Sequence, residues 1–209
     1  AKNGGKVYPV SFVGGISHLH VQGNQFLETL ASSVPMECWG YGAEALPADS
    51  KIKQHHHGTA WGLDMFSLLR KSRITINRHG EIAENSANNM RLFEATGCGA
   101  LLVTDYKDNL NELFEIGREC VAYRTPEECV ALVKYYVDHP DEAEQIAQAG
   151  QARTLRDHTY GKRMEQTAEI LERHLRYKTE AGRYSGIDTS HISHSHALIA
   201  KSDVSESMT

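Results

Sequence analysis

The chain has 209 residues, enough for one sizeable domain. Hydrophobic residues make up 40% and charged residues 23%, which excludes a disordered, collagen-like or disulfide-stapled protein. Lys and Arg total 22 against 27 Asp and Glu, so a net charge of -5 leaves no basic excess to attract nucleic acid or an anionic membrane. No apolar run approaches the roughly 20 residues of a membrane span, and no signal peptide opens the chain. We therefore expect a soluble, cytoplasmic protein without a nucleic-acid partner or a membrane span.

The cysteines and histidines indicate a reduced protein that needs no metal. Cysteines stand at four scattered positions with no CxxC spacing: Cys38, Cys98, Cys120 and Cys129. We expect four reduced thiols, as in cytosolic proteins. The run from His55 to His57 consists of consecutive residues, which cannot all converge on one ion, so we expect no metal site there.

Short apolar runs rich in β-branched residues alternate with helical patterns, which is typical of a parallel sheet flanked by helices. In the first half we expect strands at 7–13, 36–39, 73–77 and 100–104, with helices near 25–32, 63–69 and 87–96. In the second half we expect a strand at 120–123 and helices near 110–114, from 126, from 140 and at 160–177. This order predicts an α/β fold, a Rossmann-like open parallel sheet with helices on both faces.

Local signals set several of these boundaries. Thr125-Pro126-Glu127-Glu128 is a capping box with proline at the first helical position, which predicts a helix start. Pro140 opens the next helix, and Gly150 is expected to stop it. The strand at 100–104 is almost wholly apolar, as in strands buried on both faces. No apolar periodicity remains near the end, so we expect a domain at 1–178 and a flexible polar tail at 179–209.

Ligands of open parallel sheets bind outside the carboxyl ends of the strands, and this rule nominates candidate residues. They are Gly14 and Gly15, Gly40, the segment from Asn77 to His79, and Thr104 with Asp105. The two glycines after the first strand either let the backbone approach a ligand or form a plain turn. The chain has neither GxGxxG nor GxxxxGK[ST] at these places, so a dinucleotide or a P-loop mechanism is not expected.

The segment from Glu84 to Ala95 is the richest in polar side chains. Asn85 or Ser86 is expected to cap the helix, whose first amides and dipole would form an anion site. Asn88, Arg91 and Glu94 are spaced by three and would share one helix face, with Glu94 roughly 12 Å from the helix start. That distance suits a nucleoside diphosphate. The alternative is a solvated ion pair on an exposed helix.

At this point the sequence resembles a known family. The likeness is to the donor-binding half of group-1 GT-B glycosyltransferases, and within them to the spore-maturation-protein-like branch. It covers roughly residues 8 to 175 and is carried by motifs at 12–17, 61–65, 88–97, 101–105, 117–123, 125–128, 146–151 and 158–160. The resemblance implies one Rossmann-like half of a GT-B fold and a glycosyltransferase that uses a nucleotide-diphosphate sugar as donor, independently of metal.

The resemblance also implies roles for individual residues. Glu94 would bind the ribose, and the segment of Ser86, Asn88 and Asn89 would face the diphosphate and sugar. From the helix face that it shares with Glu94, and not from the resemblance, Arg91 is expected either to neutralise a phosphate or to fix Glu94 by pairing along the helix.

Three further residues take their expected roles from the resemblance. Gly14 and Gly15 would approach the reaction centre. Trp61 would stack on the base, unless it is a core residue.

The catalytic candidates are His79 and Glu84. Many group-1 enzymes carry two glutamates with seven residues between them, and that count back from Glu94 reaches Ser86, so the sugar-contacting carboxylate is absent or supplied by Glu84. Relatives in the branch often have an arginine a few residues after the first glycines, where this chain has Gln22-Gly23-Asn24.

The resemblance accounts for only the second half of a GT-B enzyme. We expect an N-terminal Rossmann-like half, upstream in the same gene or on a partner subunit, and an acceptor that the sequence does not identify. The first functional hypothesis is therefore glycosyl transfer. The alternatives are a non-catalytic module that binds a sugar nucleotide or carbohydrate, and a purely structural domain.

Overall fold

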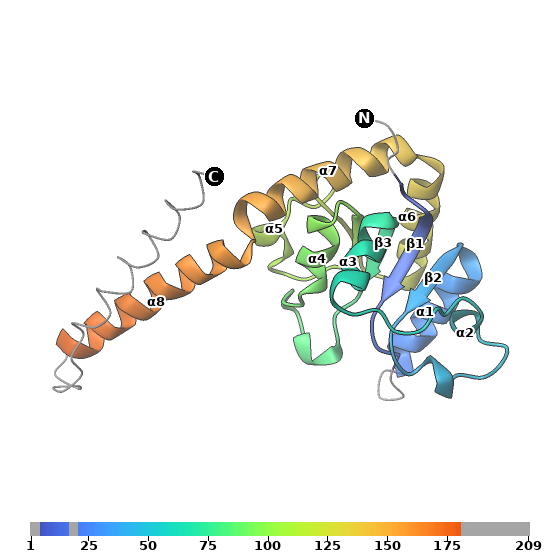
Figure 1. Cartoon of the computed structure of the whole chain (residues 1–209), viewed down its shortest axis with the longest axis horizontal. Coiled ribbons are helices and arrows are strands. Elements are labelled where there is room, and N and C mark those ends of the chain that lie inside the picture. Colours follow the sequence, from blue (N-terminus) through green and yellow to red (C-terminus); the bar gives the residue numbers. More distant parts are fainter. Residues whose placement is uncertain (1–4, 17–20, 181–209) are drawn as a thin grey trace, which may run out of the picture. The chain divides into compact units, whose positions relative to one another are not determined.

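The computed structural model describes residues 5–16 and 21–180, so the tail expected at 179–209 lies almost wholly outside the described residues. The chain divides into two compact units between Thr159 and Tyr160. The first unit is built on a parallel five-stranded sheet of order β2-β1-β3-β4-β5 (Figure 1). Its strands are β1 (Tyr8–Val13), β2 (Met36–Trp39), β3 (Ser72–Asn77), β4 (Leu101–Asp105) and β5 (Val121–Tyr123).

Helices cover both faces of this sheet, as the sequence predicts (Figure 1). The helices of the first unit are α1 (Val21–Ser33), α2 (Lys51–Gln54), α3 (Gly62–Lys71), α4 (Arg91–Gly97), α5 (Leu110–Leu113), α6 (Pro126–Asp138) and α7 (Pro140–Asp157). Two short 3-10 turns, η1 (Ala43–Ala45) and η2 (Glu81–Ala83), lie in loops. The α/β, Rossmann-like fold class is thereby confirmed.

The alternation of side chains along the strands divides the interior into two cores. Leu101 and Val103 point into a first core shared with α1 and α6, while Leu102 between them points into a second core shared with α3, α4 and α5. All three side chains are fully buried. β4 lies between β3 and β5, which confirms the prediction that this apolar strand is buried on both faces.

The capping box predicted before α6 is present. Thr125 Oγ1 accepts a hydrogen bond from the backbone amide of Glu128, and α6 begins at Pro126. The Glu128 carboxylate reaches back to the amide of Arg124 at 2.6 Å. A local sequence signal is sufficient here because both partners lie within one helical turn.

All four cysteines are free, in agreement with the prediction of reduced thiols. Burial raises the pKa of the Cys38, Cys120 and Cys129 thiols to about 12. Thiols with such a high pKa carry almost no thiolate near neutral pH, so these three act as small apolar core residues.

Gly150 does not stop a helix, and that prediction was wrong. α7 continues through Gly150 to Asp157, and its path joins the two cores. Ala147 packs in the first core, whereas Thr154 Oγ1 bonds Thr96 Oγ1 of α4 at 2.6 Å. A Cβ at position 150 would lie 2.3 Å from the carbonyl oxygen of Glu119, so glycine serves here for close packing and not for helix termination.

Alanine at Gly150 is therefore expected to destabilise the domain. Alanine normally stabilises a helix interior by roughly 1 kcal/mol relative to glycine. Overpacking costs about 1–3 kcal/mol, and the upper part of that range, about 2–3 kcal/mol, applies here because the crowded atom belongs to the backbone. We expect Gly150→Ala to lower the free energy of unfolding by about 1–2 kcal/mol in urea denaturation. Gly80→Ala, with no atom within 4 Å of the added Cβ, is the matched control. An unchanged or raised stability of Gly150→Ala would contradict the close packing.

The second unit is described only by α8 (Tyr160–Glu180). Exposed ion pairs run along it, with Lys162 beside Glu165 and Arg176 beside Glu172.

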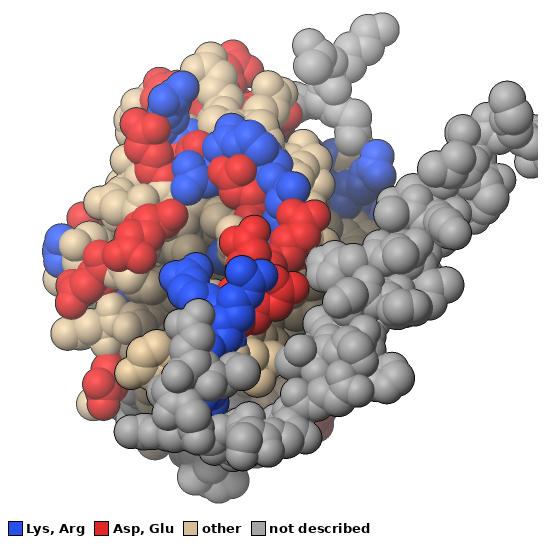
Figure 2. All heavy atoms as spheres, turned by 90° about the vertical axis from the view of Figure 1, so that its left-hand side faces the viewer, with Lys and Arg blue, Asp and Glu red and all other residues tan. Residues whose placement is uncertain are grey.

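Figure 2 shows Lys and Arg side chains interspersed with Asp and Glu side chains over the described part of the face it presents. None of the described helices is both long enough and apolar enough to cross a membrane.

Candidate functional site

A pocket of about 200 Å³ lies at the carboxyl ends of β1 and β3. This is the edge at which parallel sheets bind ligands, and it is where the sequence places the candidate residues. The pocket brings together Gly14, Gly15, Asn89 and Arg91 from the predicted donor-binding set. Its lining residues are Phe12, Val13, Gly14, Gly15, Tyr41, Asn77, Arg78, Gly80, Asn89 and Arg91.

Close packing explains the two glycines after β1. A Cβ on Gly15 would lie 2.5 Å from the ring of Tyr41, and one on Gly14 would lie 2.9 Å from the ring of Phe12. Neither glycine is among those with positive φ, so a left-handed turn is not what requires them. The glycines therefore make room for the rings of Tyr41 and Phe12, and the approach of their backbone to a ligand stays a prediction.

Arg91 connects the pocket to Glu94. Its Nη1 atom donates to Glu94 Oε2 at 2.6 Å, and its Nε atom donates to the carbonyl oxygen of Val13 at 3.2 Å. The side chain of Arg91 is only 17% exposed and that of Glu94 only 16%, so the alternative of a solvated ion pair is wrong. Burial lowers the pKa of the Arg91 guanidinium and the Glu94 charge opposes that shift. Arg91 thus fixes Glu94 by pairing along α4, one of its two predicted roles.

A chain of amide hydrogen bonds holds Asn89 at the pocket wall. Asn89 Nδ2 donates to Asn77 Oδ1 at 2.9 Å, and Asn77 Nδ2 donates in turn to Thr104 Oγ1 at 2.9 Å. The buried hydroxyl of Tyr123 donates to the carbonyl oxygen of Asn77. Because Asn77 is itself buried at the end of β3, Asn89 is positioned from the core of the sheet.

His79 and Asp105 form a hydrogen-bonded pair beside this pocket. Asp105 Oδ1 lies 2.7 Å from His79 Nδ1 and also accepts from the His79 amide at 2.9 Å. Burial opposes ionisation of Asp105, but the hydrogen bonds and charge of His79 together with Lys107 outweigh it and lower the pKa of the carboxyl. The His79 side chain is fully buried, whereas its neighbours Arg78 and Gly80 line the pocket.

The helix expected at 87–96 begins later, at Arg91, and Met90 is its N-cap residue. Asn109 takes both backbone groups of Ala87, with Oδ1 accepting from its amide at 2.6 Å and Nδ2 donating to its carbonyl at 3.1 Å. The Ser86 amide donates to Ala83. These groups are unavailable to a helix, so the predicted cap at Asn85 or Ser86 and the anion site on that helix start were wrong.

The remaining predicted residues lie outside the pocket lining. Asn88 and Ser86 are exposed in the loop before α4, so Asn88 does not share a helix face with Arg91. Glu84 is exposed in the same loop with φ 45°. Trp61 is 66% exposed at the start of α3, which excludes its interpretation as a core residue.

Four residues of the pocket lining were missing from the predicted set: Phe12, Val13, Tyr41 and Gly80. Val13 directly precedes the nominated Gly14, Tyr41 directly follows the nominated Gly40, and Gly80 directly follows the nominated segment from Asn77 to His79, which contains Arg78. The rule that ligands bind at strand ends therefore located the strand ends and loops that contain these residues. It did not say which side chains turn toward the pocket.

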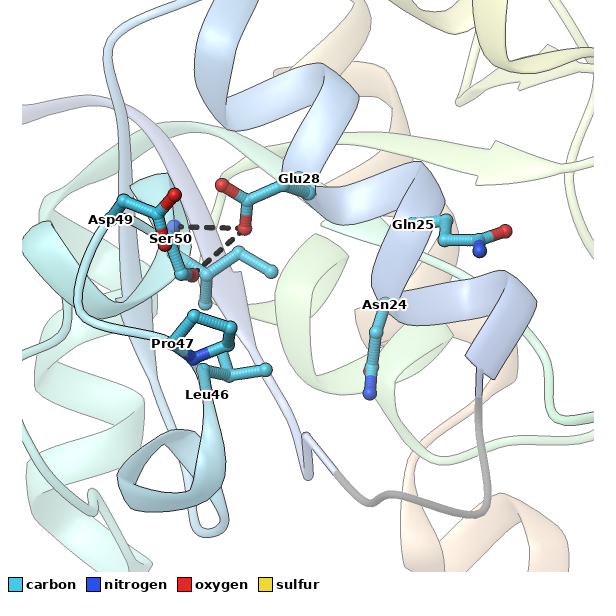
Figure 3. A pocket seen from close by; sticks show the side chains of 8 residues that line it. Asn24, Gln25, Glu28, Leu46, Pro47, Asp49 and Ser50 are labelled. Atoms are coloured by element: carbon cyan, nitrogen blue, oxygen red, sulfur yellow. Dashed lines mark hydrogen bonds between the residues drawn. The ribbon is translucent and has the colours of Figure 1, made fainter.

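A second pocket, of about 290 Å³, lies between α1 and the segment leading into α2 (Figure 3). Glu28 Oε2 accepts from Ser50 Oγ at 2.9 Å, and the other oxygen accepts from the Lys51 amide. Ser50 Oγ in turn accepts from the Lys53 amide at 3.1 Å. The polar groups of this pocket thus fix the start of α2 against α1, and no predicted site residue lines it.

The consecutive histidines lie alongside the edge strand β2. His57 Nε2 is 2.6 Å from Glu37 Oε2, and the His57 ring stacks on Trp39. The backbone of His56 pairs with Cys38, so this segment covers the sheet edge. Within residues 5–16 and 21–180, no three His, Cys, Asp or Glu side chains are placed to hold a metal ion.

Comparison with known proteins gives the family. A family model described as glycosyl transferase-like matches residues 21–169, which is more than half of the 209 residues. The chain belongs to this glycosyl transferase-like family. A comparison with curated proteins found no match.

Solved glycosyltransferase structures share the fold of this family member. HepE from Anabaena in complex with UDP is 15% identical with a TM-score of 0.61, over 78% of this chain and 48% of that one. Sucrose-phosphate synthase from Thermosynechococcus elongatus is 10% identical with a TM-score of 0.62, over 80% of this chain and 45% of that one. The chain therefore spans about half the length of these two structures.

A third similar structure is itself a single domain. It is the C-terminal domain of the group-1 family glycosyl transferase LpcC from Francisella tularensis, 11% identical with a TM-score of 0.54. The match covers 73% of this chain and 87% of that domain. The five-stranded parallel sheet with its helices thus has the same Rossmann-like fold as this glycosyl transferase domain.

Proposed function

We propose that this chain is the donor-binding half of a GT-B glycosyltransferase and that its pocket takes a nucleoside-diphosphate sugar. The observation that carries the proposal is the pocket at the carboxyl ends of β1 and β3, which Arg91 lines together with Gly14 and Gly15. Small residues and a guanidinium at a strand end suit a diphosphate, which needs close backbone approach and positive charge. Two HepE structures in this fold contain UDP and UDP-glucose, which makes UDP the first ligand to test.

In the proposed complex Glu94 binds the ribose. Its carboxylate is held by Arg91 through one oxygen, which leaves the second oxygen to accept hydrogen bonds from ribose hydroxyls. Arg91 is oriented by Val13 as well, so the pair is preorganised before a ligand arrives. Asn89, held by Asn77 at the pocket wall, is placed for the sugar or diphosphate. Trp61 is exposed and available to stack on the base.

The reaction asks this half to hold the donor and to stabilise its leaving group. The bond between the anomeric carbon and the β-phosphate oxygen breaks, and its electron pair stays on the phosphate. An acceptor hydroxyl forms the new bond to that carbon and loses its proton. Guanidinium charge near the diphosphate stabilises the departing anion, so we propose metal-independent transfer. His79 and Glu84 stay predicted catalytic residues.

The wider assignments belong to the same proposal. We place the chain in the spore-maturation-protein-like branch on the sequence motifs, with a cytoplasmic location supported by its free cysteines. The acceptor would bind to an N-terminal Rossmann-like half in the same gene or on a partner subunit. The match covers only about half of the HepE and sucrose-phosphate synthase structures, which supports a second half in the complete enzyme. The alternative is a sugar-nucleotide-binding module without catalysis, which turnover by the two halves together would exclude.

Calorimetric titration of the chain with UDP, GDP and ADP tests donor binding. We expect one nucleotide to bind and Glu94→Gln to weaken it about ten- to hundredfold, the loss expected when a charged hydrogen-bond acceptor is removed. Glu169→Gln, an exposed carboxylate on α8, is the matched control and should leave affinity unchanged. Equal affinities in folded wild type and Glu94→Gln would contradict the ribose assignment. Absence of nucleotide binding even with the natural preceding half present would overturn the proposed function.

A further inference from the structure

Arg78 lies against the first turn of α1 at Gly23. A Cβ built on Gly23 would lie 2.0 Å from both Cζ and Nη1 of Arg78, and 2.4 Å from Nη2. The guanidinium therefore occupies the space that any larger residue at position 23 would fill. Arg78 follows β3 and is half-buried, and it lines the same pocket as Gly14 and Gly15.

This contact explains a glycine that the helix itself does not need. Gly23 is the third residue of α1, and its φ is not among the positive values. Glycine in a helix costs roughly 1 kcal/mol relative to alanine, and no turn geometry offsets that cost here. Because Gly23 has no Cβ, the flat guanidinium of Arg78 can lie against the helix at this position. The pairing joins residues 55 positions apart in the chain because β1 and β3 are neighbours in the sheet.

Arg78 also brings positive charge to the pocket, since it is one of the two arginines in the lining. The other is Arg91, which is paired with Glu94. A guanidinium keeps its charge at any ordinary pH and presents a planar set of donors that matches phosphate oxygens.

We propose that Arg78, seated in the space left by Gly23, holds the diphosphate of the donor in this pocket. The proposal rests on the proposed function and names the residue that supplies the binding charge. Half-burial strengthens such a contact because the surrounding medium screens it less than water does. Arg91 then acts chiefly by orienting Glu94. Arg78 thus binds the diphosphate, and Arg91 serves the ribose through Glu94.

Two kinds of substitution separate this role from a structural one. Arg78→Ala removes the charge, whereas Gly23→Ala keeps it and displaces the guanidinium from its seat. Alanine suits a helix better than glycine does, so Gly23→Ala should melt no earlier than wild type. Arg118→Ala, which removes an exposed arginine at another part of the domain, is the matched control for net charge.

The experiment is calorimetric titration of the full chain and these variants with UDP, inorganic pyrophosphate and uridine. We expect Arg78→Ala and Gly23→Ala to weaken UDP and pyrophosphate about tenfold or more, with uridine affinity unchanged and Arg118→Ala like wild type. If wild type binds UDP and neither variant loses affinity, the role of Arg78 is overturned while the proposed function stands. Binding of pyrophosphate that depends on Arg78, without preference for any nucleoside diphosphate, would support Arg78 and count against the donor. If wild type binds neither UDP nor pyrophosphate even with the natural preceding half present, both proposals fall.

Discussion

Replacing Gly40 with alanine is expected to destabilise the domain by about 3–5 kcal/mol. Gly40 follows β2 with φ 143°, a backbone conformation that favours glycine. A Cβ at this position would lie 1.9 Å from the carbonyl oxygen of Gly14. Neither atom belongs to a flexible side chain, so relief requires the backbone after β1 or after β2 to move. The pocket wall at Gly14 would move with it.

Gly58→Ala isolates the backbone part of this cost. Gly58 also has a positive φ, 85°, but no atom lies within 4 Å of an added Cβ. It should lose only the conformational cost of about 1–2 kcal/mol. Urea denaturation of both variants gives the difference, which reports the clash at Gly40. Equal losses in the two variants would show that the loops after β1 and β2 are not held together as tightly as the structure indicates.

The elements of the fold that sequence predicts best are those set by local signals. The strand expected at 36–39 has those bounds in the structure, and the Thr125 capping box begins α6 as predicted. Two predictions about helix ends, the cap at Asn85 or Ser86 and the stop at Gly150, were wrong because of residues distant in the sequence. Asn109 takes the backbone groups of Ala87 from 22 positions away, and a carbonyl at Glu119 gives Gly150 its purpose. Neither partner is visible to helical periodicity or to capping rules.

In the candidate site, too, local sequence rules predict some features, whereas others depend on the fold. The strand-end rule locates the edge of the sheet, and the spacing of three predicts the pairing of Arg91 with Glu94. The seating of Arg78 on Gly23 depends on the sheet order, which places β1 beside β3. A sequence read alone shows a helix that contains a glycine and a strand that ends in a polar run. Only the fold shows that one residue makes room for the other.

Breaking the ion pair between Arg91 and Glu94 should cost far more stability than breaking an ordinary pair on a helix surface. Arg91→Met removes the partner of a carboxylate that is only 16% exposed and also leaves the Val13 carbonyl without its guanidinium donor. We expect a loss of about 2–4 kcal/mol in the free energy of unfolding, somewhat below the cost of breaking a fully buried pair. The substitution should also weaken UDP, because Glu94 would lose its fixed orientation.

A double-mutant cycle distinguishes the pair from the packing of the Arg91 side chain. In Arg91→Met with Glu94→Gln no charge is left uncompensated, so the double variant should be more stable than the sum of single losses predicts, by about 1–3 kcal/mol. The pair of Arg118 and Glu115 has the same spacing of three but side chains 74% and 59% exposed, and its cycle should give under about 0.5 kcal/mol. Urea denaturation at one pH and salt concentration measures both cycles. If the Arg91 cycle is additive, the guanidinium contributes through packing alone, and the preorganised ribose carboxylate loses its physical basis.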